Sequence, residues 1–295
     1  MNKRKYYLTL WATAAVAVMI AAVLTTATYA WFSANRKVET ETVTARTGSA
    51  DLELQLSKQP EGSFTSETIT DTDGQEYNGV ELDSLGAREL MPVSTADLKT
   101  FVYSPSTNEG EATENTLQLL PDAQKAEIVY NCTIYLRLSD NGTLSDSATV
   151  NLYLDDLGIE KTEEEQAAES RLLNAARLGL AINGNFLILR YSEDAEGAES
   201  NTLLNGSRLQ PGQVLSYENG NVTAADIPAE NQGLLSEYQY SDENLTPKPI
   251  LAGMEPGTIY PLDIYFYLEG CDPDCDDTAQ KQQAGLRLAF YAALA

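Results

Sequence analysis

Residues 127–139 read Glu-Ile-Val-Tyr-Asn-Cys-Thr-Ile-Tyr-Leu-Arg-Leu-Ser and show the clearest alternation in the chain. Every second residue from Ile128 to Leu138 is apolar or a cysteine, whereas Asn131, Thr133 and Arg137 stand between them. A strand with one face on a core and the other toward solvent has this period of two. The stretch therefore predicts a half-buried antiparallel strand.

The same alternation recurs in three other stretches of the chain. Two shorter strands are also predicted, at residues 38–43 and 99–104. The inward faces comprise Leu52, Leu54 and Leu56, then Leu262, Ile264, Phe266 and Leu268, and finally Leu286, Leu288 and Phe290. The outward face of the second of these strands comprises Asp263, Tyr265, Tyr267 and Glu269. Many such strands without an alternating strand–helix rhythm predict a mainly antiparallel protein.

Two Asn-Gly pairs predict tight hairpin turns between these strands. Asn141-Gly142 is expected to join residues 127–139 to a strand with Val150, Leu152 and Leu154 on its inward face. Asn183-Gly184 is expected to join residues 177–182 to residues 186–191. The returning strand 186–191 is apolar on both faces, which predicts a central position in its sheet.

One helix is expected at residues 163–176, since Thr162 and Glu165 have capping-box spacing ahead of apolar residues at helical intervals. It covers an open end of the sheets or, in a second interpretation, binds a partner. Residues 59–97 and the acidic region 192–257 are expected to form long surface loops, the second with some hidden order. The predicted fold class is all-β, an antiparallel β-sandwich with one short helix.

The first 30 residues differ from the rest and predict export. Lys3, Arg4 and Lys5 precede an apolar run over residues 8–30, which is long enough for a signal peptide or a spanning helix. Thr28 and Ala30 suit the −3 and −1 positions of a signal peptidase, so cleavage would make Trp31 the first residue. The expected organisation is a signal peptide or membrane anchor at 1–30 and a β-sandwich domain at 31–295, secreted or held at the cell surface.

Composition excludes several classes of function. The formal net charge is −25, and phosphate backbones need a partner of the opposite sign, so nucleic acid is not expected. The chain has no histidine, which removes the commonest general base and metal ligand. The expected role is not enzymatic, and an exported hydrolase using a pair of carboxylates is kept as a remote alternative.

Residues 269–277 contain five carboxylates in nine residues. Asp272, Asp274 and Asp276 have the alternating spacing of a calcium loop. The Gly and Glu expected at the sixth and twelfth loop positions are replaced by Asp277 and Gln283. The stretch is therefore either a calcium-stiffened loop or a solvated acidic turn, and calcium is the one cofactor predicted.

The three cysteines of the chain leave one thiol without a partner in any single disulfide. Cys271 and Cys275 are close enough in sequence to form a bridge across the intervening turn, and this pairing is preferred. A bridge between Cys132 and Cys275 is the alternative.

The junction Thr28-Tyr29-Ala30-Trp31-Phe32-Ser33, followed by Val43 and by Gly48-Ser49-Ala50-Asp51-Leu52-Glu53-Leu54, resembles the start of the TasA/camelysin family. Residues 265–275 are similar to a motif in related proteins. The resemblance covers about the first 55 and the last 35 residues. It implies a surface protein of Gram-positive bacteria cut by a SipW-type signal peptidase, a jelly-roll fold, and a role as a fibre or biofilm-matrix subunit.

The expected function is self-assembly into fibres or association with other surface proteins. After cleavage, a mobile terminal strand carrying Trp31, Phe32, Val38 and Val43 would add to an edge of the next subunit. The alternative is a membrane-anchored extracellular binding or adhesion module, whose ligand is held by residues 59–97 and 192–257.

Overall fold

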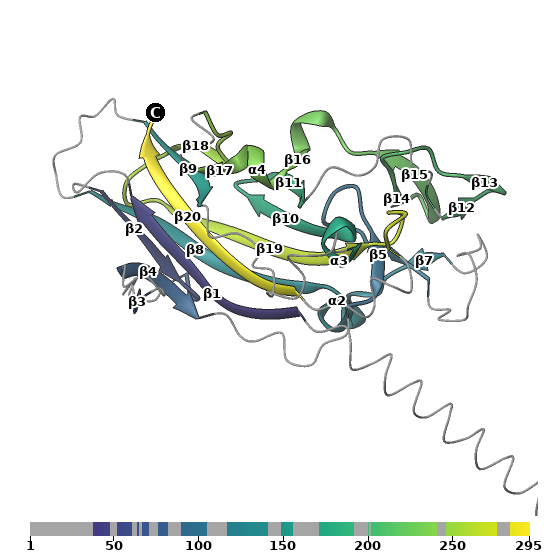
Figure 1. Cartoon of the computed structure of the whole chain (residues 1–295), viewed down its shortest axis with the longest axis horizontal. Coiled ribbons are helices and arrows are strands. Elements are labelled where there is room, and N and C mark those ends of the chain that lie inside the picture. The colour runs from purple at the N-terminus through teal and green to yellow at the C-terminus, as the bar shows by residue number, and fades with distance from the viewer. Residues whose placement is uncertain are drawn as a thin grey trace, which may run out of the picture.

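A computed structural model describes residues 38–47, 52–60, 64, 67–70, 76–81, 90–104, 117–140, 149–155, 171–191, 200, 202–240, 246–275 and 284–295. Strands dominate these residues and the helices are short, so the protein is all-β, as predicted. Two large sheets account for most of the strands (Figure 1).

The first sheet has seven strands among the described residues and contains both the first and the last strand of the described chain. Its strands are β1 (Val38–Thr47), β3 (Glu67–Thr70), β4 (Glu76–Glu81), β9 (Val150–Asp155), β17 (Gln239–Tyr240), β18 (Leu251–Met254) and β20 (Ala284–Leu294). β1 runs parallel to β20 on one side and antiparallel to β4 on the other. β1 is therefore an inner strand of its own sheet.

The second sheet has nine described strands, built around β8 and β19. Its strands are β2 (Leu52–Ser57), β5 (Pro92–Ser94), β6 (Val102–Tyr103), β7 (Gln118–Leu119), β8 (Tyr130–Asp140), β10 (Ala176–Ile182), β11 (Asn185–Arg190), β16 (Gln232–Leu234) and β19 (Ile259–Glu269). The alternating stretches 52–56, 128–138 and 262–268 thus lie in one sheet, with β8 paired to both β2 and β19.

Side chains from both large sheets form one hydrophobic core cluster. The nine-stranded sheet contributes Leu54, Ile134 and Phe266, among others, and the seven-stranded sheet contributes Leu152 and Phe290; all five are at most 1% exposed. These five residues belong to the inward faces that alternation predicted, so their predicted core positions are confirmed.

The hairpin predicted at Asn183-Gly184 is confirmed, since β10 and β11 pair in register from Arg177 with Arg190 to Ile182 with Asn185. Asn183 and Gly184 both have positive φ, 50° and 79°, as a two-residue hairpin turn of this kind requires. β11 is flanked by β10 and β16 and buries side chains on both faces, which explains its continuous apolar sequence.

The predicted pairing of residues 127–139 with 150–154 is wrong. β8 pairs with β2 and β19, whereas β9 pairs with β20, β17 and β18 in the other sheet. The chain therefore crosses from one sheet to the other between β8 and β9. Alternation showed that both strands face the same core, but it carries no information on which strands are hydrogen-bonded.

The described helices are one to two turns long: α2 (Asp122–Ile128), α3 (Arg171–Ala175), α4 (Leu235–Tyr238) and the 3-10 turn η2 (Ala229–Asn231). α3 confirms the end of the helix predicted at 163–176, and Thr162 to Ser170 lie outside the described residues. α2 replaces the start of the strand that was predicted from Glu127.

The outer face of the nine-stranded sheet carries a second layer. Residues 95–101, α2 and the hairpin of β14 (Gln213–Glu218) with β15 (Asn221–Asp226) pack on it, and β12 (Leu203–Leu204) pairs with β13 (Ser207–Arg208) nearby (Figure 1). Phe101, Val214 and Tyr267 meet in this second hydrophobic cluster. The hidden order expected in residues 192–257 is thus found, and the outward face expected for Tyr267 is wrong.

Candidate functional site

A pocket of about 820 Å³ lies on the outer face of the nine-stranded sheet, between that sheet and the region 200–248. β10, β11 and the end of β19 supply its floor. The turn before β14, the end of β15, η2 and β16 supply the walls. The acidic region that was predicted as a long loop therefore forms most of the wall of this pocket.

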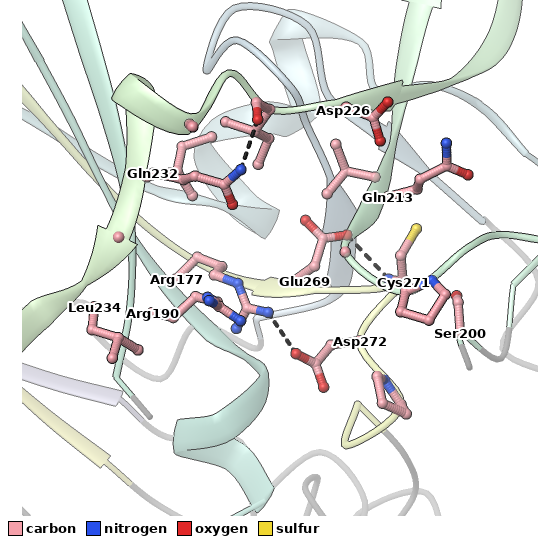
Figure 2. Close-up of a pocket in the computed structure, with 18 of the residues that line it drawn as sticks. Arg177, Arg190, Ser200, Gln213, Asp226, Gln232, Leu234, Glu269, Cys271 and Asp272 are labelled. Atoms are coloured by element: carbon pink, nitrogen blue, oxygen red, sulfur yellow. Dashed lines mark hydrogen bonds and ion pairs between the residues drawn. The ribbon is translucent and has the colours of Figure 1, made fainter. Parts of the chain in front are cut away.

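Two arginines lie side by side on the floor (Figure 2). Arg177 of β10 and Arg190 of β11 are directly opposite each other in the hairpin register, so their side chains share a face. The Arg177 side chain is only 8% exposed and pairs with Asp272 at 2.5 Å. It also donates hydrogen bonds to the carbonyl oxygens of Asn174 (2.6 Å) and Ala176 (3.0 Å). These contacts hold its guanidinium in one position.

Glu269, the last residue of β19, points into the same pocket and is 3% exposed. Its carboxyl accepts a hydrogen bond from the backbone N–H of Cys271 at 3.0 Å. Burial raises the pKa of this carboxyl to about 7, although a hydrogen bond from Ser94 and the charge of Arg177 oppose the shift. Glu269 therefore holds or releases its proton near neutral pH.

The rim of the pocket is more exposed and carries both charges. Lys248 and Glu237 form a 2.9 Å ion pair whose side chains are 56% and 41% exposed. Asp226 ends β15 on the opposite wall. Gln232 donates a hydrogen bond from Nε2 to the carbonyl oxygen of Ile227 (2.7 Å), which ties β16 to the segment after β15.

The pocket combines apolar walls with convergent polar groups, which is the usual composition of a ligand site. Ile188, Val214, Ile227 and Leu234 provide the apolar part. Cys271 also lines the pocket, but burial raises the pKa of its thiol, so the thiol stays protonated and is a poor nucleophile. The arrangement is suited to binding a small ligand.

The three aspartates of the predicted calcium loop are only partly within the described residues, because Asp276 lies outside them. Asp272 gives one carboxylate oxygen to Arg177 and accepts the backbone N–H of Asp274 with the other (2.8 Å). Asp274 accepts a hydrogen bond from the Asn174 side chain (2.9 Å). Within the described residues no group of three or more His, Cys, Asp or Glu could hold a metal ion. Calcium stays a prediction.

The predicted bridge between Cys271 and Cys275 is not formed in the structure, and neither is the alternative from Cys132 to Cys275. Cys271 is buried in a small cluster with Val102 and Leu215, and its Sγ lies 3.4 Å from Ser94 Oγ. Cys275 instead packs against the main core, as does Cys132. Cys271 and Cys275 thus contact different hydrophobic clusters.

Thr28, Ala30, Trp31 and Phe32 lie outside the described residues, so signal cleavage and the aromatic anchors stay predictions. Val38 and Val43 lie in β1, paired with Ala284 and Leu288 of β20. The expected mobile strand with few contacts in its own subunit is therefore corrected to an inner strand. No helix in the described part of the chain is long and apolar enough to cross a membrane.

Sequence reasoning missed the pocket, although one signal for it was present. The Asn183-Gly184 turn fixes the register of its hairpin, and this register alone places Arg177 opposite Arg190. Two cations facing each other across otherwise apolar strands are unusual, since like charges at such positions repel. That Glu269 and Asp272 join them could not be predicted, because this depends on the pairing of β10 with β19.

Comparison of the chain with protein-family models, with curated proteins and with solved structures found no match.

Proposed function

We propose that this protein is an exported or cell-surface structural protein that assembles into fibres, and that assembly proceeds by exchange of β1 between copies. The resemblance of the N-terminal junction to the TasA/camelysin family supports a fibre or biofilm-matrix subunit. The position of β1 supports strand exchange as the mode of assembly.

The proposed architecture for such a subunit is a β-sandwich of the jelly-roll kind. Two observations support it: the seven- and nine-stranded sheets share one hydrophobic cluster, and the chain crosses between the sheets between β8 and β9. Face-to-face packing of two sheets around such a cluster is the defining property of sandwiches.

The single observation that carries the proposal is the insertion of β1 between β4 and β20. β1 is the first described strand and runs parallel to β20 over most of its length. Only one end of β1 is connected to the rest of the described chain, through residues 48–51 to β2 in the other sheet. β1 can therefore leave its place without threading any other segment of the described chain.

Withdrawal of β1 would leave unpaired backbone groups on β20 and β4 and would remove Ala45, 1% exposed, from the core. The β1 strand of another copy restores both. An exchange in which each copy donates to the next and receives from the previous one does not close, and it produces a filament. Trp31 and Phe32 would precede the donated strand as apolar anchors.

A reversible lock on β1 tests this proposal. Thr44 and Ala289 are register partners in the β1–β20 ladder, so Thr44→Cys/Ala289→Cys, in a background with alanine at the three native cysteine positions, should form a disulfide within the monomer. Purified exported protein should form fibres visible by electron microscopy in reductant and none when oxidised. Fibres that form equally in the locked state would refute exchange of β1.

A membrane-anchored extracellular binding module is the second candidate, and the pocket on the nine-stranded sheet favours it. In that case residues 8–30 would remain attached and the region 192–257 would contact the ligand, as the pocket walls suggest. N-terminal sequencing separates the two candidates: the first requires Trp31 at the start of the exported protein, and the second requires an uncut N-terminus.

A further inference from the structure

The charged groups that line the pocket compensate one another. Three cations and four carboxyl groups of the described residues lie around it. Arg177 is ion-paired with Asp272 at 2.5 Å, and both side chains are at most 8% exposed. Glu237 accepts a hydrogen bond from Lys248 at 2.9 Å, and the charge of Arg190 also acts on its carboxylate. Each cation therefore already acts on a carboxylate of the protein.

The other two carboxyl groups add little charge to the floor of the pocket. Glu269 is 3% exposed and accepts a hydrogen bond from the backbone N–H of Cys271 at 3.0 Å. Burial raises the pKa of this carboxyl to about 7, so it is mostly protonated at pH 6. Asp226 is exposed on the far wall, where water solvates its charge. A charged ligand would therefore find no counter-ion at the floor, and a desolvated charge without a partner is costly.

An uncharged ligand with many hydroxyl groups suits such compensated charges. A hydroxyl group both donates and accepts hydrogen bonds, so it bonds to a paired guanidinium or carboxylate without separating the pair. Further polar groups lie around the same cavity, namely the amides of Gln213 and Gln232 and the hydroxyl of Ser200 (Figure 2). Gln232 uses Nε2 for its hydrogen bond to Ile227, so its Oε1 is the acceptor that it offers to a ligand.

Aliphatic side chains supply the apolar part of the pocket. Ile188, Val214 and Ile227 line it and belong to one hydrophobic cluster. A sugar ring has hydroxyl groups around its edge and C–H groups on its faces, so a face packs on these side chains while the edge meets the polar groups. The volume of about 820 Å³ lies within the range of about 300–1,000 Å³ that is usual for small-ligand sites.

We propose that this pocket binds an uncharged sugar, with its hydroxyl groups at Gln213, Gln232 and Glu269 and one C–H face against the aliphatic side chains. The proposal goes beyond fibre assembly and does not depend on it, since β1 contributes no residue to the pocket. A fibre of such subunits presents one sugar site per copy. The same proposal names the ligand class for the binding-module alternative, which N-terminal sequencing tests separately.

Matched probes on the purified protein test the preference for an uncharged sugar. Methyl glycosides of glucose, galactose, mannose and N-acetylglucosamine are titrated at pH 6 and followed by NMR. The tightest binder is then compared with the uronic acid and the 2-amino sugar of the same ring. The neutral glycoside should bind at least about tenfold more tightly than either charged counterpart, because the charged group loses water without gaining a partner.

Three results overturn the proposal. They are binding of none of the four glycosides, binding of a charged counterpart as tight as that of the neutral sugar, and tighter binding of N-acetyl-leucinamide. The last probe is neutral and has a larger apolar body but no hydroxyl group, so its preference would identify an apolar amide as the ligand.

A variant on the wall locates the site. Gln213→Ala should weaken binding of the neutral glycoside about tenfold, because it removes an amide that hydrogen-bonds the sugar. Gln59→Ala is the matched control, since Gln59 is exposed and does not line the pocket, and it should leave binding unchanged. Unchanged binding in Gln213→Ala contradicts the proposal. If that variant does not fold, the next variant still decides.

Glu237→Gln tests the charge compensation directly. It removes the carboxylate on which Lys248 and Arg190 act, and the side chain is 41% exposed, so the fold should tolerate the change. The uronic acid should then bind about tenfold more tightly than it binds the wild type, whereas the affinity for the neutral glycoside should change less than about threefold. An unchanged affinity for the uronic acid would show that compensated charges do not select the ligand and would refute the proposal.

Discussion

Protonation of Glu269 in the pocket affects the free energy of unfolding of the whole protein. The pKa of its carboxyl is raised from 4.5 to about 7 by burial. Between these values the folded protein holds a proton that the unfolded chain has released, so this residue makes the folded state less stable as the pH rises from 4.5 to 7. Above pH 7 both states are ionised and its contribution is constant.

Replacement of Glu269 by Gln should therefore flatten the pH dependence. Relative to the wild type, Glu269→Gln should become more stable with rising pH, by roughly 3 kcal/mol at most at pH 7, because a pKa difference of one unit corresponds to about 1.4 kcal/mol. Urea unfolding at pH 5, 6 and 7 measures this. Glu237→Gln is the control: the pKa of Glu237 is lowered through its hydrogen bond from Lys248, so it should not change the slope in this range.

Tyr267 has a fully buried side chain whose hydroxyl has no hydrogen-bond partner among the described residues. An unsatisfied buried hydroxyl costs about 1–3 kcal/mol. Tyr267→Phe should consequently leave the free energy of unfolding unchanged or raise it. Tyr103→Phe is the matched control, because its hydroxyl bonds to Gln124 (3.1 Å) and Gln118 (3.2 Å), and its loss should destabilise by about 1 kcal/mol. A large loss of stability in Tyr267→Phe would contradict this interpretation.

At the scale of the element, β19 is the strand that organises the nine-stranded sheet. It pairs with β8 on one side and with β10 on the other, and it alternates between two buried environments. Phe266 faces the main core, and Tyr267 faces the second cluster with Phe101, whose ring centroid lies 5.6 Å away. β19 is thus buried on both faces near its C-terminal end.

This double burial gives a direct prediction for core substitutions. Phe266→Ala and Tyr267→Ala should each cost about 3–5 kcal/mol, since both remove a large buried aromatic side chain. Thr133→Ala on β8 should cost about 1 kcal/mol, because it removes only the 2.6 Å hydrogen bond to Asp263. Equal small costs for Tyr267 and Thr133 would restore the sequence-based expectation of one buried face.

The sequence predicted the strands, their inward faces and one hairpin turn better than it predicted which strands are hydrogen-bonded to each other. Inward faces, the β10–β11 hairpin and the end of α3 followed from local patterns, because alternation and an Asn-Gly turn act over a few residues. The placement of β8 and β9 in different sheets did not follow, since both strands have the same pattern and the segment between them is long enough to cross. The second layer over Tyr267 was missed because tyrosine, with an aromatic ring and a polar hydroxyl, occurs both on solvent-exposed faces and in cores. Its presence in a strand therefore does not show which face is buried.

The candidate site was less predictable than the fold. Asp272 was identified from its spacing with other carboxylates and assigned to calcium, whereas its nearest charged partner is Arg177, far away in sequence. Such a pairing depends on β10 and β19 lying side by side, and no local pattern encodes it.

At the scale of the whole molecule, an acidic chain with a basic N-terminal tip predicts export with the tip left in the cytoplasm. Ala30→Arg should block cleavage and leave the protein in the membrane fraction, because signal peptidases require a small residue at −1. Immunoblotting of membrane and culture fractions measures this, with Ala34→Arg beyond the junction as the control. Normal release of the Ala30→Arg protein would show that cleavage occurs elsewhere.

If β1 is exchanged, the β1 strand beside each β20 in a fibre comes from another copy. The fibre proposal depends on this. Thr44 and Ala289 are neighbours in the β1–β20 ladder. One preparation carries only Thr44→Cys and a second, isotopically heavy, carries only Ala289→Cys, both with alanine at the three native cysteine positions. The two preparations are mixed, allowed to assemble, and oxidised.

Mass spectrometry of the disulfide-linked peptides then gives the answer. Exchange of β1 predicts a disulfide joining a light Thr44→Cys peptide to a heavy Ala289→Cys peptide in the fibre fraction and none in the monomer fraction. Fibres that contain no such mixed disulfide would contradict it, since each copy would then have kept its own β1.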